Sequence, residues 1–96
     1  IQAALMKAAE VPLETARWCA EVAELAAICA TKGNTNAASD SGVAALLAEA
    51  AAKGAAYNVR INVAAMHDKA AGAPMAEEAK RLVAAARGMV VTAVEF

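Results

Sequence analysis

Two asparagines near the middle of the chain, Asn58 and Asn62, are the polar side chains best suited to hold a small molecule. Projected onto a helix at 100° per residue, they share one face with Gly54, opposite the charged pair Glu49 and Lys53. A buried amide without a partner costs about 1–3 kcal/mol, and alanine is abundant in this chain. We therefore expect both amides to point inward and to hydrogen-bond either a ligand or a neighbouring helix. The second interpretation makes them structural cross-links.

Gly54 lies on the same face and supports the expectation of a close neighbour. A glycine inside a helix costs about 1 kcal/mol relative to alanine, and the residues on both sides of it in sequence include Ala52 and Ala55. Close approach is the physical reason to place a glycine there. We expect another helix backbone or a flat ligand to lie against Gly54.

Asp40 is a carboxylate expected in the first turn of the same helix, and Ser39 before it is the expected N-cap. Asp40 falls on the same stripe as Asn58, but about 27 Å away along a straight helix. A small substrate cannot contact both within one subunit. An antiparallel helix from a second copy, or the turn that carries Asn34, can bring the two ends together at a shared interface site. The alternative role of Asp40 is a charge that favours the positive end of a helix dipole.

The elements that carry these residues are predicted to be helices throughout. Alanine makes up about a third of the chain, whereas aromatic residues are only 3%, a composition that favours helix over strand. The patterns predict long antiparallel helices at about 1–32, 39–68 and 75–94, arranged as an all-α, up-down bundle in a single domain, 1–96. The charged stripe of the first segment keeps its phase across Pro12, which indicates one helix kinked there.

The connections between these helices follow from turn chemistry. Lys32 supplies a basic last turn to the first helix, and Gly33 is expected to form a left-handed C-terminal cap. Gly72 and Pro74 are predicted to mark the turn before the third helix.

Composition limits the classes of function. Nine basic and ten acidic residues give a net charge of -1 without a basic cluster, so nucleic-acid binding is not expected. No apolar run reaches the roughly 20 residues that span a bilayer. No group of side chains has the spacing of metal ligands, and His67 is a lone histidine near a helix end. We expect no metal site and no membrane partner.

The two cysteines and the apolar content predict the surroundings of the chain. Cys19 and Cys29 would lie about 15 Å apart on one helix, too far to form a disulfide, and on the side opposite the charges, where we expect both to be buried together with Val22 and Ala26. Free thiols suggest a cytoplasmic location. A hydrophobic content of 60% in 96 residues predicts that one apolar face is buried against another chain, in a homodimer or higher homo-oligomer.

One long segment resembles a known family. The stretch Gly33–Val63, GNTNAASDSGVAALLAEAAAKGAAYNVRINV, and the upstream AAEVPLETA of Ala8–Ala16 resemble the cyclodeaminase/cyclohydrolase family, which acts on one-carbon tetrahydrofolates. The similar motifs are the VPL before a long helix, the Gly-Asn turn, the Ser-Asp helix start and the Asn-Val-x-Ile-Asn segment. Asp68 matches an acidic position just beyond them. The resemblance covers about two thirds of the chain.

The resemblance implies a helical subunit that associates in pairs and converts 5-formiminotetrahydrofolate to 5,10-methenyltetrahydrofolate with release of ammonia, or hydrolyses the methenyl compound. It implies no bound cofactor, because the tetrahydrofolate derivative is the substrate. The matching motifs give Asp40 as the candidate catalytic residue and Asn34, Ser39, Asn58 and Asn62 as candidate folate-binding residues. Family members carry a preceding half with a glycine- and serine-rich motif that this sequence lacks, so we expect a C-terminal fragment with an incomplete site. The alternative function is a non-catalytic helical dimerisation module.

Overall fold

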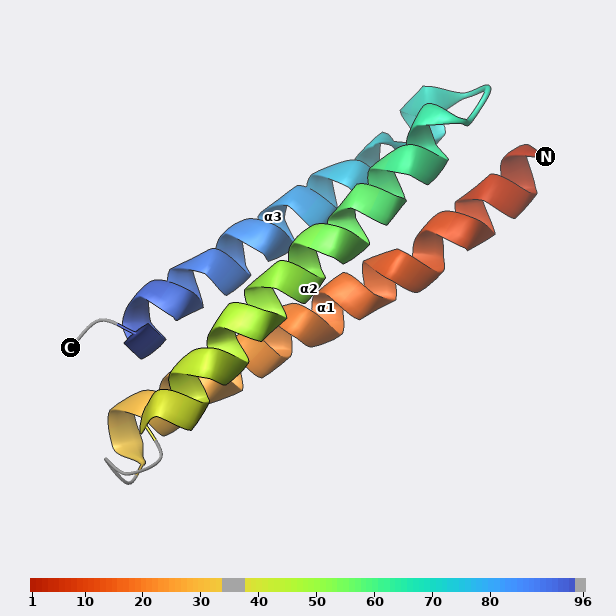
Figure 1. Ribbon diagram of the computed structural model, residues 1–96. Coiled ribbons are helices and arrows are strands. Elements are labelled where there is room, and N and C mark those ends of the chain that lie inside the picture. Colours follow the sequence, from red (N-terminus) through yellow and green to blue (C-terminus); the bar gives the residue numbers. More distant parts are fainter. Residues whose placement is uncertain (34–37, 95–96) are drawn as a thin grey trace.

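The chain forms three long helices that lie side by side and run in alternating directions (Figure 1). The computed structural model describes residues 1–33 and 38–94, where α1 is Gln2–Lys32, α2 is Ala38–Ala64 and α3 is Lys69–Val94. The bundle is 50 Å long and 16 by 14 Å across. The expected all-α, up-down architecture is confirmed, and α1 continues through Pro12 as a single helix.

The core between these helices is built mainly from alanine. Among the described residues, thirteen of the seventeen buried hydrophobic residues are alanine, and the largest fully buried side chains are Met66 and Val59. Small side chains let helix axes approach closely, but each one removes little apolar surface from water. The bundle is therefore closely packed, with a small contribution to stability from each buried residue.

The turn between α2 and α3 lies earlier in the sequence than predicted. α2 ends at Ala64 instead of residue 68, and α3 begins at Lys69 instead of residue 75, so Pro74 lies inside α3. The reason is Asp68, whose Oδ1 accepts a hydrogen bond from the backbone N–H of Ala71 at 3.3 Å, as an N-cap does. Gln2 fixes the same residue from α1: its side chain donates to the Asp68 carbonyl at 2.9 Å and accepts from the Asp68 N–H at 3.2 Å.

Gly72 has a packing role in α3, so its prediction as a turn residue was wrong. A Cβ at this position would lie 2.6 Å from the Met66 sulfur and 3.1 Å from the methyl groups of Val63. The first turns of α3 therefore pack directly onto the end of α2, and the absence of a side chain at Gly72 permits that contact.

The end of α1 and the start of α2 differ from the predicted caps. Gly33 has φ −84° and ψ −177°, so the left-handed cap is wrong. Its N–H donates to the Cys29 carbonyl at 2.7 Å, and a Cβ would collide with the same oxygen. α2 begins at Ala38, which places Ser39 inside the first turn and not at the N-cap, whereas Asp40 lies in the first turn as expected. Asn34 lies outside the described residues.

The expected burial of both cysteines is only partly correct. Cys19 is half-buried, Cys29 is exposed, and both are free. Val22 is also 47% exposed, whereas Ala26 is buried. The charged stripe of α1 lies beside α3, where Arg17 forms an ion pair with Glu78 at 2.6 Å. The face of α1 opposite the charges therefore does not point into the core. None of the described helices is long and apolar enough to cross a bilayer.

Candidate functional site

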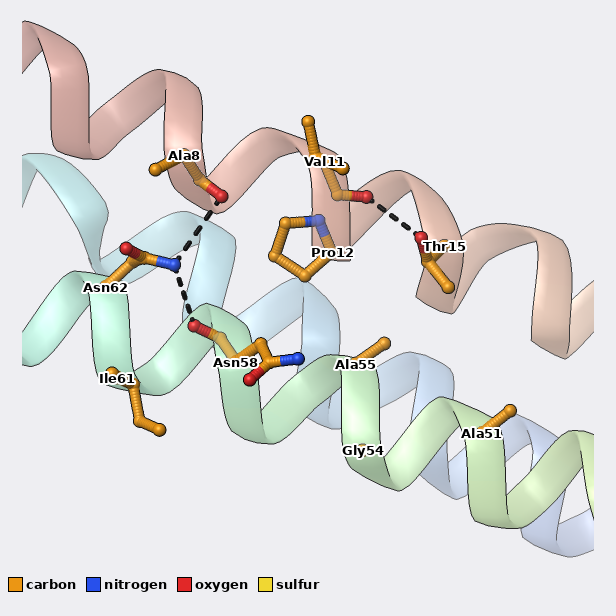
Figure 2. A pocket seen from close by; sticks show the side chains of 10 residues that line it. All are labelled: Ala8, Val11, Pro12, Thr15, Ala51, Gly54, Ala55, Asn58, Ile61 and Asn62. Atoms are coloured by element: carbon orange, nitrogen blue, oxygen red, sulfur yellow. Dashed lines mark hydrogen bonds between the residues drawn. The ribbon is translucent and has the colours of Figure 1, made fainter.

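An open groove between α1 and α2 contains both mid-chain asparagines (Figure 2). Its volume of about 490 Å³ falls within the range of about 300–1,000 Å³ that is usual for small-molecule sites. The lining residues come from the first half of α1 and the second half of α2: Ala8, Val11, Pro12, Thr15, Ala51, Gly54, Ala55, Asn58, Ile61 and Asn62.

Asn62 is half-buried and joins the two helices. Its amide nitrogen donates to the carbonyl of Asn58 at 3.0 Å and to the carbonyl of Ala8 at 3.5 Å. Ala8 precedes Pro12 by four residues, and proline has no N–H to donate to that carbonyl. Asn62 therefore supplies a donor where Pro12 leaves an acceptor without its helical partner. The expectation that this amide is hydrogen-bonded is confirmed.

Asn58 is exposed, so the expectation that its amide points into the interior is wrong for the single chain. Its side chain lies on the wall of the groove that faces Pro12 (Figure 2), and no hydrogen bond to it is found within the described residues. An amide carries both donors and acceptors. Asn58 therefore presents an unused hydrogen-bonding edge to whatever occupies the groove.

Gly54 is exposed beside Asn58, and apart from its chain neighbours and the backbone of its own helix, no atom lies within 4 Å of the place where its Cβ would be. The expected close neighbour is therefore absent from the described part of the chain. The surface at Gly54 lacks a side chain, so a flat group or another backbone can reach the helix there. No contact among the described residues explains why a glycine, which weakens a helix, occupies this position.

The remaining candidate residues lie at the other end of α2. Ser39 and Asp40 are exposed in its first turn, about 27 Å from Asn58 at 1.5 Å per residue. Ser39 borders a separate hollow together with Gly42 and Thr92. The structure thus brings Asn58 and Asn62 together and leaves Asp40 at a distance within one chain.

The groove can bind and orient a ligand, but its described lining contains no titratable side chain. Sequence patterns missed the α1 wall, which includes Pro12 and Thr15. The Thr15 hydroxyl donates to the carbonyl of Val11 at 3.1 Å. The available signal was Pro12 itself, because a proline inside a helix frees the carbonyl four residues before it.

Comparison with the sequences of known proteins assigns this chain to a family. Residues 1–81, which include the whole groove, match the sequence model of the family described as formiminotransferase-cyclodeaminase. A methenyltetrahydrofolate cyclohydrolase from Methylorubrum extorquens is 45% identical over 86 residues, which are 90% of this chain and 41% of that relative. The chain therefore spans about two fifths of the length of the curated relative that it matches. On these matches, this chain belongs to the formiminotransferase-cyclodeaminase family.

Proposed function

We propose that the chain acts in one-carbon folate metabolism as part of an enzyme that hydrolyses 5,10-methenyltetrahydrofolate. The observation that carries this proposal is the 45% identity to a methenyltetrahydrofolate cyclohydrolase. The family match adds support because it includes the groove with its unused Asn58 amide and bare Gly54. The α1–α2 groove is then the folate-binding part of the site.

Its residues suit the pterin ring of a folate. The flat ring lies against the helix surface at Gly54, where no side chain intervenes. Asn58 pairs with the donors and acceptors along the ring edge, in the way that amides commonly recognise heterocycles. Asn62 keeps its nitrogen on the Ala8 carbonyl and offers its oxygen to the ligand.

The reaction requires a proton donor and acceptor as well as a binding surface. Water adds to the carbon that bridges N5 and N10, the bond from that carbon to N5 breaks, N5 receives a proton and the formyl group stays on N10. One further proton is released, so the reaction is balanced. A carboxyl group suits these transfers. Asp40 is our candidate for this role, and its distance from Asn58 means that it acts from another chain.

The second candidate reaction is cyclodeamination of 5-formiminotetrahydrofolate, which the family description favours. N10 attacks the formimino carbon, the imino nitrogen takes the N10 proton and one further proton from solvent, the bond from that carbon to the nitrogen breaks so that ammonia leaves, and the 5,10-methenyltetrahydrofolate cation forms. The same groove serves this reaction, because the product is the compound that the first reaction consumes. A third possibility, a dimerisation module without catalysis, is supported by the exposed apolar side chains of α1 and α2.

A segment exchange tests the enzymatic proposal. The matching 86 residues of the Methylorubrum extorquens enzyme are replaced by those of this chain, and conversion of 5,10-methenyl- to 10-formyltetrahydrofolate is followed by chromatography. We expect the exchanged enzyme to hydrolyse the substrate and Asn58→Ala to reduce kcat/KM by about 10–100-fold, the effect of about 1.5–3 kcal/mol of lost hydrogen bonding.

The matched control is Glu21→Ala, an exposed polar residue of α1 outside the groove and outside the hollow beside Ser39, which should leave the rate unchanged. An exchanged enzyme with normal helical content but no hydrolysis would refute the primary proposal. Turnover of 5-formiminotetrahydrofolate instead would favour cyclodeamination.

A further inference from the structure

Pro12 lies inside α1, with helical residues on both sides of it. Proline is the least favourable residue in a helix interior, because it lacks the N–H that donates along the helix and its ring presses on the carbonyl four residues before it. Alanine, the best helix former, makes up about a third of the chain. A residue that breaks this local rule is expected where a gain elsewhere compensates for it, and such places are commonly functional sites.

The backbone change caused by Pro12 falls on the wall of the groove between α1 and α2. The carbonyl of Ala8 lies four residues before Pro12, so it lacks its helical donor. It accepts a hydrogen bond from the side-chain nitrogen of Asn62 on α2 at 3.5 Å (Figure 2). Ala8, Pro12 and Asn62 all line the groove. The carbonyl without a helical donor therefore lies where the two helices face each other across the candidate site.

The amide of Asn62 has no donor left for a ligand. An amide nitrogen carries two N–H groups, and the nitrogen of Asn62 contacts the carbonyl of Ala8 and, at 3.0 Å, the carbonyl of Asn58. Because both partners are carbonyl oxygens, only the nitrogen end of the amide can face them, and the side chain cannot turn over without losing both bonds. The amide oxygen is left to accept a hydrogen bond, and its position is fixed by α1 as well as by α2.

The second proline of the chain shows that this arrangement is particular to Pro12. Pro74 lies inside α3 and leaves the carbonyl of Ala70 without its helical donor in the same way. Within the described residues no side chain donates to the Ala70 carbonyl, and Pro74 borders a different hollow, between α1 and α3. Of the two prolines, Pro12 is the one whose freed carbonyl is bonded to a groove residue of a neighbouring helix.

We infer that Pro12 is a positioning residue of the groove, which acts on the ligand only through Asn62. By leaving the Ala8 carbonyl free, Pro12 provides the anchor that holds the Asn62 amide in one orientation and ties α1 to α2 beside Asn58. The inference rests on the proposed function, because it assigns the groove to the folate. The ligand then meets an amide that is already ordered, so less conformational freedom is lost on binding.

This role predicts opposite effects of one substitution on folding and on binding. In Pro12→Ala the N–H of residue 12 donates to the Ala8 carbonyl, so α1 gains a backbone hydrogen bond and a better helix former. The carbonyl is then occupied, and the Asn62 amide loses one of its two anchors. A proline that only shapes the helix would give no reason for weaker binding in a variant that folds better.

Steady-state kinetics of the exchanged enzyme test this prediction. We expect Asn62→Ala to raise the KM for 5,10-methenyltetrahydrofolate about tenfold and Pro12→Ala to raise it about three- to tenfold. The kcat should stay within about twofold in both, because the lost contact is the same in the ground and transition states. The urea midpoint of Pro12→Ala should equal or exceed that of the unmodified enzyme. An unchanged KM for Pro12→Ala in an enzyme that hydrolyses the substrate would overturn the inference.

A double-mutant cycle separates a role through Asn62 from a direct effect of Pro12. In the Asn62→Ala background, Pro12→Ala should change the KM by less than about twofold, because the residue through which it acts is gone. Pro74→Ala is the matched control, since it restores the same kind of backbone hydrogen bond in α3 and should leave the KM unchanged. A further severalfold rise in the Asn62→Ala background, or an equal effect of Pro74→Ala, would refute the inference.

NMR of the 96-residue chain tests the Asn62 hydrogen bonds without any substrate. The side-chain N–H groups of Asn62 should exchange with water roughly tenfold more slowly than those of Asn58, which is exposed. Pro12→Ala should reduce this difference by about threefold or more, and Pro74→Ala should not. Equal exchange at Asn62 in the unmodified chain and in Pro12→Ala would overturn the inference, whether or not the exchanged enzyme is active. Slow exchange that depends on Pro12, together with an unmodified exchanged enzyme that does not hydrolyse the substrate, would refute the proposed function and the part of Pro12 in folate binding.

Discussion

At the scale of single residues, the carbonyl oxygen of Ala8 explains why an asparagine occupies position 62. Pro12 removes the N–H that would have met this oxygen, and the Asn62 amide reaches across from α2 to supply a donor at 3.5 Å. Ala8 is exposed at the edge of the groove, so water is the alternative partner of its carbonyl. The polar residue thus compensates a backbone defect on another helix, whatever ligand the groove holds.

A double-mutant cycle measures this compensation. Asn62→Ala should lower the free energy of unfolding by about 1 kcal/mol in the unmodified chain, the usual net worth of one hydrogen bond. In a Pro12→Ala background residue 12 regains the backbone N–H that donates to the Ala8 carbonyl, so the same substitution should cost less. The expected coupling is about 0.5–1 kcal/mol in urea unfolding. Equal costs in both backgrounds would show that Asn62 does not depend on Pro12.

These residues show which parts of the site could be predicted from the sequence. That Asn62 needs a partner is evident from one sequence, because a half-buried amide must be hydrogen-bonded. That Ala8 provides it requires knowing which helix lies beside α2. The error at Asn58 has the same origin. Lys53 marks one exposed side of α2, and we expected the opposite side to be buried. In a three-helix bundle, however, the buried side of α2 faces the space between α1 and α3, which is not directly opposite the charge. Site roles for Asn34, Ser39, Asp40, Asn58 and Asn62 stay predictions.

Gly72 and Gly88 provide a matched pair for a prediction about packing on α3. Gly72→Ala should lower the free energy of unfolding by about 1–3 kcal/mol, because its Cβ would press on Met66 and Val63 in a filled space. Gly88→Ala should raise it by about 0.5–1 kcal/mol, since no atom outside its chain neighbours and the backbone of its own helix lies within 4 Å of that Cβ and alanine favours the helix. Urea unfolding of both variants gives the comparison. Stabilisation by Gly72→Ala would mean that the α2–α3 contact is looser than described.

At the scale of the elements, the start of α3 shows how local signals compete. Gly72 and Pro74 are typical turn residues, yet both lie inside α3. Asp68 caps the helix through Ala71, and Gln2 holds Asp68 from α1. The cap is local and could have been read from the sequence, but the bond to Gln2 joins residues 66 positions apart. The helical class and the antiparallel order were predictable because they depend on alanine content and on short connections.

The ion pair between α1 and α3 predicts a dependence of stability on pH. Arg17 hydrogen-bonds the Glu78 carboxylate at 2.6 and 2.8 Å and thereby lowers the pKa of Glu78, while partial burial opposes the shift. The unfolded chain then binds the proton more readily than the folded one. Stability from this pair is present above the ordinary glutamate pKa of about 4.3 and is lost as the pH falls through the lower folded value.

Urea midpoints measured between pH 7 and pH 2 test this linkage. The unmodified chain should lose stability below about pH 4.3 more steeply than Glu78→Gln, which has no carboxyl to titrate at that position. The effect should shrink in high salt, because both partners are partly exposed. Glu77→Gln is the control, since the described residues show no ion pair from Glu77 to α1. Parallel acid limbs for the unmodified chain and Glu78→Gln would refute the linkage.

At the scale of the whole molecule, stability and association are connected through the alanine core. Alanine side chains dominate the buried set, whereas Trp18, Leu47 and Val11 remain exposed. Each buried CH₂ group is worth about 0.8 kcal/mol, so the single bundle leaves much of its available hydrophobic stabilisation unused. If a second copy covers these exposed side chains of α1 and α2, that stabilisation is gained on pairing, and folding becomes linked to protein concentration.

Thermal unfolding over a hundredfold range of protein concentration measures that linkage. The Tm of the unmodified chain should rise by roughly 5 °C across the range, because pairing favours the folded state by mass action. Emission from Trp18, the only tryptophan of the chain, should move to shorter wavelength over the same range as the indole leaves water. Leu47→Glu should remove both effects. Val91→Glu is the control and should remove neither, because Val91 is 54% exposed on α3. A Tm and an emission maximum that stay constant for the unmodified chain would mean that the apolar side chains of α1 and α2 are open to solvent at every concentration tested.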